Sequence, residues 1–219
     1  SAPGSPTPTA PTAHAHNDLL SLELWIAGEP VCIDPGTYCY TSDVEERNRF
    51  RSTAAHNTVM VDGQEINRIP PDEPFRLDWD AQVKLLEWSV GEREVRLVAE
   101  HDGYCNLHAS PRHRRTVSFN PESRAWKIED SVTTLLEDTV DFTVRFHSPI
   151  PVHVVSESDT SFTANIGSVR LEGQADAQLI ISVEESRYAI QYGKVVPSYT
   201  LSVRCNSTSS LSCRIYPGA

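Results

Sequence analysis

Short segments of alternating apolar and polar residues recur along most of this 219-residue chain, and this recurrence constrains the fold more than any other feature. A period of two places apolar side chains on one face of a β-strand, whereas an amphipathic helix needs a period near 3.6. Gly, Pro, Asn and Asp separate most of the segments, as expected for turns between antiparallel strands. We therefore predict an all-β fold, an antiparallel two-layer β-sandwich of the super-sandwich type. The expected strands cover residues 20–26, 31–33, 58–61, 83–88, 95–100, 114–119, 125–130, 139–146, 152–155, 161–166, 169–172, 178–183, 199–205 and 212–216.

Outside the strands, the pattern predicts a turn of helix over residues 44–49 and a flexible linker or expression remnant over residues 1–12. Residues 13–219 are expected to form one domain. The five cysteines are an odd number at no metal-like spacing. Cys205 and Cys213 flank a Ser/Thr/Asn turn and are candidates to face each other in a hairpin, but most of the cysteines are expected to be buried free thiols.

The charge and hydropathy of the chain exclude several classes of partner. A net charge of −11 is unsuited to nucleic acid, which attracts a basic face. No apolar run reaches the ~20 residues needed to span a bilayer, and no basic-then-apolar signal opens the sequence. Two arginine-rich stretches can be interpreted either as a locally basic groove for an acidic polymer or as solvated edge strands: Arg47, Arg49 and Arg51, and Arg112, Arg114 and Arg115.

The candidate chemistry lies in three short segments, residues 14–18, 34–38 and 51–58, which hold three imidazoles and two carboxylates. Imidazole and carboxylate are the ligands that Zn²⁺ accepts where Cys is not used, and an unligated imidazole is a common general acid or base. His14 and His16 are two residues apart, so on an extended strand both point to the same face. They can chelate one ion together, or one can bind the ion while the other faces a substrate.

Asp34 and His56 complete the candidate set. Asp34 ends a strand-like run just before a Pro-Gly turn, and His56 follows four small residues that allow close backbone packing. Two imidazoles and one carboxylate, with water as a fourth group, form a normal zinc shell. Asn17, Asp18, Asn57 or Thr58 are candidates to orient the ligand rings. The alternative is that these are separate polar residues satisfied by backbone, with no ion.

Other motifs are absent or ambiguous. The sequence has no Gly-x-Ser-x-Gly elbow, no phosphate-binding Gly-rich loop and no Cys-x-x-Cys pair, which argues against a serine hydrolase, a nucleotide enzyme and a zinc ribbon. The four tryptophans are either core side chains or platforms for sugar rings. Because an aromatic residue on a strand usually belongs to the core, we assign none as a platform: Trp25, Trp79, Trp88 and Trp126.

Three ordered motifs together resemble the C-terminal β-domain of the heparinase II/III-like polysaccharide lyases, a family that includes some alginate and oligo-alginate lyases. The motifs are His-Ala-His-Asn-Asp from His14, then Asp-Pro-Gly-Thr-Tyr from Asp34, and Arg-Ser-Thr-Ala-Ala-His-Asn-Thr from Arg51. The resemblance is strong over residues 14–63 and looser beyond them. It implies a preceding (α/α) toroid domain, with the active cleft between toroid and sandwich.

The resemblance also implies a function. The reaction would be β-elimination on an acidic polysaccharide that contains uronic acid, at a periplasmic or secreted location. By position, His14 matches the catalytic histidine, while His16, Asp34 and His56 match the ligands of a metal ion, usually Zn²⁺. Tyr38 and Arg51 lie inside the matched motifs and are expected to bind substrate.

The family's catalytic tyrosine and carboxamide belong to the toroid, so we expect this chain to be inactive alone. The alternatives are a non-catalytic carbohydrate-binding β-sandwich with a structural metal, and a related domain that serves exopolysaccharide assembly. The sequence does not name the polysaccharide.

Overall fold

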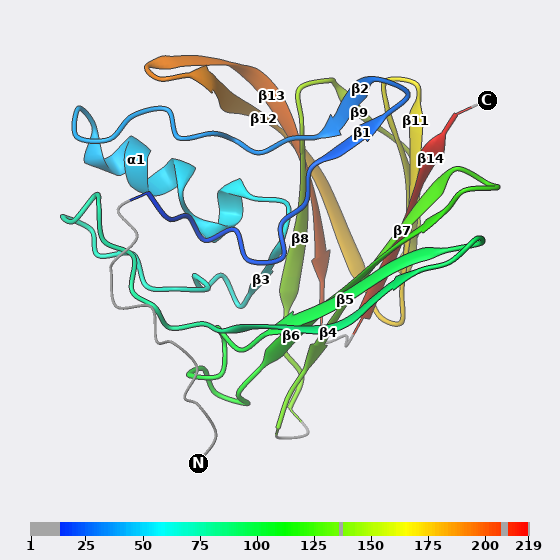
Figure 1. Cartoon of the computed structure of the whole chain (residues 1–219), viewed down its shortest axis with the longest axis horizontal. Helices are drawn as coiled ribbons and strands as arrows, with labels where there is room; N and C mark the ends of the chain where they lie inside the picture. Colours follow the sequence, from blue (N-terminus) through cyan, green and yellow to red (C-terminus); the bar gives the residue numbers. More distant parts are fainter. Residues whose placement is uncertain (1–13, 136–137, 207–209, 219) are drawn as a thin grey trace.

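The chain folds into packed antiparallel β-sheets with a small helical and loop region at one side, as the computed structural model shows (Figure 1). It describes residues 14–135, 138–206 and 210–218, so the linker expected over residues 1–12 lies outside the described residues. In chain order the elements are β1 (Leu24–Ile26), β2 (Glu29–Cys32), α1 (Val44–Phe50), the 3₁₀ helix η1 (Thr53–Ala55), β3 (Val59–Val61), β4 (Val83–Val90), β5 (Val95–His101), β6 (Arg112–Asn120), β7 (Ala125–Thr133), β8 (Phe142–Ser148), β9 (Val152–Glu157), β10 (Ser161–Ile166), β11 (Val169–Ala175), β12 (Leu179–Gln191), β13 (Lys194–Cys205) and β14 (Ser210–Pro217).

The strands form an eight-stranded sheet in the order β4-β5-β6-β7-β14-β11-β10-β9, a four-stranded sheet in the order β12-β13-β8-β3, and the β1–β2 hairpin. Every strand pairing among the described residues is antiparallel. The all-β sandwich predicted from the sequence is confirmed. No helix in the described part of the chain is long and apolar enough to cross a membrane.

The core lies between the sheets and follows the alternation of the sequence. β10 and β11 bury every second side chain, so their apolar residues face inward together. Side chains such as Val144 and Leu201 of the four-stranded sheet and Leu171 and Ile215 of the eight-stranded sheet belong to one buried cluster. Gly173 on β11 leaves room for the ring of Phe162, since a Cβ at this position would overlap the ring.

Several strand bounds differ from the expected ranges, and two of the differences are large. Residues 20–23 are not a strand, and Leu20 has a left-handed backbone with a φ of 58°. The β12–β13 hairpin is longer than the alternation predicted, because its outer half is largely exposed and has no buried face to impose a pattern.

The cysteines are all free, and the hairpin considered for Cys205 and Cys213 is wrong. Cys205 ends β13 in the four-stranded sheet, whereas Cys213 lies on β14 in the eight-stranded sheet. Both thiols are buried, and burial raises the pKa of Cys205 to about 12. They behave as small apolar core groups.

A chain of buried, hydrogen-bonded polar side chains crosses three adjacent strands of the large sheet, β5, β6 and β7. The Gly103 N–H donates to Nδ1 of His101 (3.2 Å), so the proton of His101 lies on Nε2, which donates to Nδ1 of His113 (3.1 Å). His113 Nε2 donates to Asp130 (2.7 Å), and Arg115 binds both oxygens of the same carboxylate (2.8 and 2.9 Å). Burial alone would raise the pKa of Asp130, but the Arg115 charge and these hydrogen bonds hold it far below its usual range.

Because Arg115 and Asp130 form a buried ion pair, we expect a conservative substitution of Asp130 to lower the stability of the fold strongly. Asp130→Asn should lower the free energy of unfolding by about 3–5 kcal/mol, because it leaves the buried Arg115 charge without its partner. Glu129→Gln on the same strand is the matched control, since Glu129 makes an exposed ion pair with Lys127 (2.7 Å). It should cost less than about 1 kcal/mol. Equal urea midpoints for the two variants would contradict this account of the core.

Buried neutral histidines predict that acid destabilises the fold. Burial first, then the charges of His56 and Arg145, lowers the pKa of His147 from 6.5 to about 3, and burial likewise lowers the pKa values of His101 and His113. Because the unfolded chain protonates these rings near pH 6.5, it binds more protons than the folded chain between pH 6.5 and about 3.

The free energy of unfolding should therefore fall as the pH falls through that window, by up to about 1.4 kcal/mol per pH unit for each ring. Urea denaturation at several pH values measures the slope. His147→Gln should reduce it, and a flat profile below pH 6.5 would oppose the prediction.

Candidate catalytic and metal site

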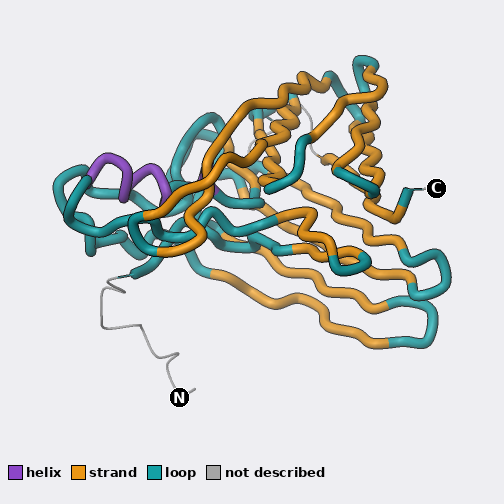
Figure 2. The backbone as a smooth tube through the Cα atoms, turned by 90° about the horizontal axis from the view of Figure 1, so that it is seen from above, coloured by secondary structure: helices purple, strands orange, loops and turns teal. Residues whose placement is uncertain are grey.

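The three segments that carry the candidate chemistry gather at the side of the sandwich where α1 and η1 lie (Figures 1 and 2). Backbone hydrogen bonds fix them to one another and to the small sheet. The Asn17 N–H donates to the Arg51 carbonyl (2.9 Å), and the Ile33 N–H donates to the His147 carbonyl on β8 (2.9 Å). The N–H of Ala189 on β12 donates to the Pro35 carbonyl (2.8 Å). Residues distant in sequence therefore form one compact region.

The helix predicted over residues 44–49 is present as α1, and it supplies a buried cation to the site. Asp43 caps its start by accepting from the Glu46 N–H (3.0 Å). Arg47 and Phe50 lie on the buried face. Arg47 passes over the ring of Tyr40, with its guanidinium carbon 5.3 Å from the ring centroid.

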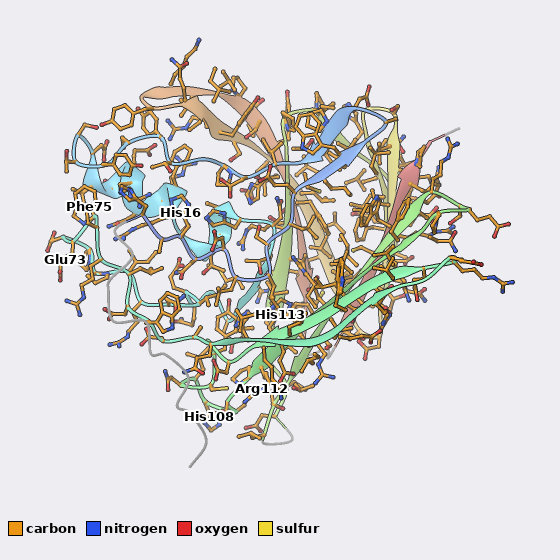
Figure 3. The ribbon with its side chains drawn as sticks, in the orientation of Figure 1. His16, Glu73, Phe75, His108, Arg112 and His113 are labelled. Carbon is orange, nitrogen blue, oxygen red and sulfur yellow. The ribbon has the colours of Figure 1, made fainter. Side chains whose placement is uncertain are left out.

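His16 accepts a hydrogen bond from the Arg47 guanidinium. Nη1 of Arg47 lies 2.8 Å from Nε2 of His16, and Arg can only donate, so this nitrogen accepts. Figure 3 shows His16 beside α1. Burial first, then the charges of His56 and Arg47, lowers the pKa of His16 from 6.5 to about 4, so its ring is neutral at pH 7.

His56 is fully buried and its ring is oriented by Asp34. Nδ1 of His56 lies 3.0 Å from Oδ2 of Asp34. Burial alone would raise the pKa of Asp34, but the hydrogen bond and charge of His56 outweigh it, and the pKa is lowered. The ring centroids of His16 and His56 are 5.2 Å apart, so the three predicted metal ligands lie together.

Two observations test whether these residues fit a metal ion. Nε2 of His56 is buried and has no hydrogen-bond partner, as a nitrogen reserved for an ion would be. A carboxylate that orients the other nitrogen of a ligand histidine is also the usual arrangement around zinc. In the arrangement that the structure shows, however, the described residues contain no group of three or more His, Cys, Asp or Glu side chains close enough together to hold an ion. The imidazole and carboxylate groups are therefore of the kind that binds zinc, but Nε2 of His16 accepts a hydrogen bond from Arg47 in this arrangement.

His14 differs from these residues in being exposed. Its ring makes edge contacts with Tyr40 (centroids 5.0 Å apart) and Phe75 (6.3 Å). It lines a hollow of about 280 Å³ together with His16, although residues 14–18 do not form the strand considered from the sequence. An exposed imidazole at the rim of a hollow can exchange protons with a bound molecule, whereas the fully buried ring of His56 cannot.

Arg51 and Tyr38 were expected to bind substrate, and the structure gives neither a contact that favours this role. Arg51 is buried, and its guanidinium donates to the Asn48 side chain (2.9 Å) and to the carbonyls of Arg76 (2.7 Å) and Glu73 (3.0 Å). It therefore fastens the 73–76 segment. Tyr38 is half-buried, with a φ of 61° and its ring 5.3 Å from that of Phe50.

The asparagines do not orient the ligand rings as considered from the sequence. Asn57 instead donates to the carbonyls of Leu22 and Ile33 (2.9 Å each) and accepts from the His147 N–H (2.7 Å). Thr58 donates to the Leu19 carbonyl (2.7 Å). These polar groups brace the backbone of the site, and Asp34 orients the imidazole.

Sequence reasoning also missed Glu65. Its Oε2 accepts from the side chain of Asn17 (2.6 Å) and from the N–H and hydroxyl of Thr53 (2.7 Å each). The histidine motif and η1 therefore share one carboxylate. No local pattern marks this glutamate, because its partners lie 48 and 12 residues away.

Comparison with known proteins identifies the family of this chain. The family model of the heparinase II/III-like C-terminal domain matches residues 3–216. The chain belongs to this family of polysaccharide lyases.

Its relatives include a heparin-sulfate lyase of Bacteroides stercoris, which is 26% identical over 156 residues, covering 68% of this chain and 20% of the relative. A heparan sulfate lyase from Pedobacter heparinus has a similar fold, with a TM-score of 0.73 at 19% identity over 94% of this chain and 31% of the other. A heparinase III structure gives a TM-score of 0.73 at 20% identity. The chain thus spans a third or less of these longer proteins.

Proposed function

We propose that this heparinase II/III-like domain is the β-sandwich part of a lyase that cleaves uronic-acid-containing polysaccharide by β-elimination, at a periplasmic or secreted location. An N-terminal (α/α) toroid would complete the active cleft. The observation that carries the proposal is the exposed His14 at the rim of a hollow, backed by the half-buried His16 and Asp34 and the fully buried His56. The curated relative named as a heparin-sulfate lyase supports the reaction class.

The reaction assigns a clear task to His14. A base removes the C5 proton of a uronate, the freed electron pair forms the C4–C5 double bond, and the C4–O bond breaks as an acid protonates the leaving oxygen. His14 is exposed and free to carry one of these protons. Its edge contacts with Tyr40 and Phe75 hold the ring at the rim of the hollow. Neutralisation of the uronate carboxylate would come from the toroid.

We also propose a bound Zn²⁺, held by His16, Asp34 and His56. Such an ion would fix the two loops that carry the histidines and add positive charge beside the hollow. The unpartnered Nε2 of His56 and the neutral ring of His16 support this assignment. Arg47 would give up its hydrogen bond to His16, or His16 would use its other nitrogen.

A second candidate is a non-catalytic carbohydrate-binding domain that keeps the metal as a structural staple. Trp88 favours it, because it is largely exposed and lines an apolar hollow that does not include His14. Detection of product from an intact wild-type protein separates the two functions.

The zinc proposal predicts one ion per chain in protein purified without chelator, measured by elemental analysis. His56→Ala and His16→Ala should each lose it, since both remove a ligand and a structural zinc site has few to spare. His108→Ala is the control, because His108 is exposed and lies far from His16 (Figure 3). Metal at background level in the wild type, or unchanged metal in His56→Ala, would refute the assignment.

The lyase proposal predicts that His14→Ala in the full-length protein reduces turnover by roughly 10²-fold or more, the usual scale for a lost general acid or base. The ultraviolet absorbance of the new C4–C5 double bond reports the product on a panel of uronate polymers. Metal content should stay unchanged, whereas His16→Ala should lose both. His153→Ala on β9 provides an exposed control. Full turnover in His14→Ala would remove His14 from the mechanism, and an inactive wild type would favour the non-catalytic function.

A further inference from the structure

The hollow beside His14 has an aromatic wall that the lyase reaction does not itself require. Its lining includes the polar side chains of His14, His16 and Asp18 together with Trp79, and Leu19, Leu77 and Ala81 are apolar neighbours. The Trp79 side chain is 56% exposed. A large apolar ring left open to solvent within a small hollow is a feature of ligand sites more than of a core.

Two buried asparagines fix Trp79 relative to the histidine motif. The Asn67 backbone N–H and side-chain amide both donate to Oδ1 of Asn17 (3.0 Å each), and Asn17 Nδ2 donates back to the Asn67 carbonyl (2.7 Å). Oδ1 of Asn67 then accepts from the N–H groups of Asp80 and Ala81 (2.9 Å each). The chain next to Trp79 is thereby tied to the residue that follows His16.

Ion pairs also restrain the residues on both sides of Trp79. Nε and Nη2 of Arg68 donate hydrogen bonds to the two carboxylate oxygens of Asp80 (2.9 Å each). The Asp78 N–H donates to the Arg68 carbonyl (3.1 Å). Arg76 pairs with Asp78 (2.9 Å). Both neighbours of Trp79 are therefore held, so the exposed indole is presented from a fixed backbone, and little ordering entropy remains to oppose binding.

We propose that Trp79 is a substrate-binding residue, the platform on which one pyranose ring of the uronate chain rests while His14 faces that ring from across the hollow. The inference rests on the proposed lyase function and adds the residue that positions the sugar. The C–H face of a pyranose is apolar and matches the indole surface, whereas its hydroxyl and carboxylate groups lie at the ring edge, toward His14 and solvent. The hollow, at about 280 Å³, is at the small end of ligand pockets and suits a single ring.

This proposal revises the expectation that none of the tryptophans serves as a platform. Trp25 has a similar exposure of 60%, but it lines a separate hollow with Phe119 and Trp126 that contains no histidine. Trp25 therefore provides a matched control of the same residue type and exposure.

Steady-state kinetics of the full-length protein on uronate oligosaccharides test the platform. Trp79→Ala should raise KM about tenfold or more while lowering kcat far less than His14→Ala does, because the ring binds sugar but moves no proton. Trp79→Phe should recover most of the loss, and Trp25→Ala should match the wild type. An unchanged KM in Trp79→Ala, or an equal rise in Trp25→Ala, would overturn the proposal.

A binding measurement separates the failure of the platform from failure of the lyase function. In the His14→Ala background, a uronate oligosaccharide should change the intrinsic tryptophan fluorescence, and Trp79→Phe should remove that change while Trp25→Phe preserves it. This result supports the platform even if the wild type forms no product on any polymer. A fluorescence response that persists in Trp79→Phe, or no response in the parent protein, shows that Trp79 does not bind sugar and contradicts the inference.

Discussion

The buried ion pair of Arg115 and Asp130 joins the candidate site to the sandwich. The two residues are direct cross-strand partners on β6 and β7. Beyond Asp130, Nη1 of Arg115 donates to the carbonyls of Leu20 (2.7 Å) and Asn57, one from each of the two loops that carry the site histidines. A buried charge pair adds little net stability compared with an apolar pair, but it fixes orientation, because breaking it is costly. The positions of the histidines therefore depend on the centre of the large sheet.

The site has two layers of differing exposure, and each suits a different task. His56 and Arg47 are fully buried, so they serve structure and charge, while His14 and Trp79 face the hollow. Asn17 lies between the layers and is fully buried, with hydrogen bonds to Glu65 and Asn67. A rigid inner layer beneath an open outer layer is the arrangement expected of a site whose reacting groups must keep their positions without ordering on binding.

The sequence predicted the fold well because burial on one sheet face imposes alternation, as in β10, whose bounds match the expected residues 161–166. It failed for the outer β12–β13 hairpin, where no buried face imposes a pattern. The three ordered motifs predicted that His16, Asp34 and His56 lie close together, as they do in the structure. They did not predict that the Arg51 side chain is buried and binds backbone carbonyls. Two of its three acceptors are backbone carbonyls 22 and 25 residues away, and no spacing rule reports such partners. For the same reason the sequence could not place Trp79 in the same hollow as His14.

The central claim is that a uronate ring is held between residue 14 and Trp79 on a site braced by the sandwich. A crystal structure of the full-length His14→Ala protein with a bound uronate oligosaccharide tests it most directly. The account predicts a pyranose ring on the indole of Trp79, with its C5 directed at position 14. An oligosaccharide bound only in the separate hollow at Trp25 and Trp126, with the 14–18 segment free of sugar, would contradict it.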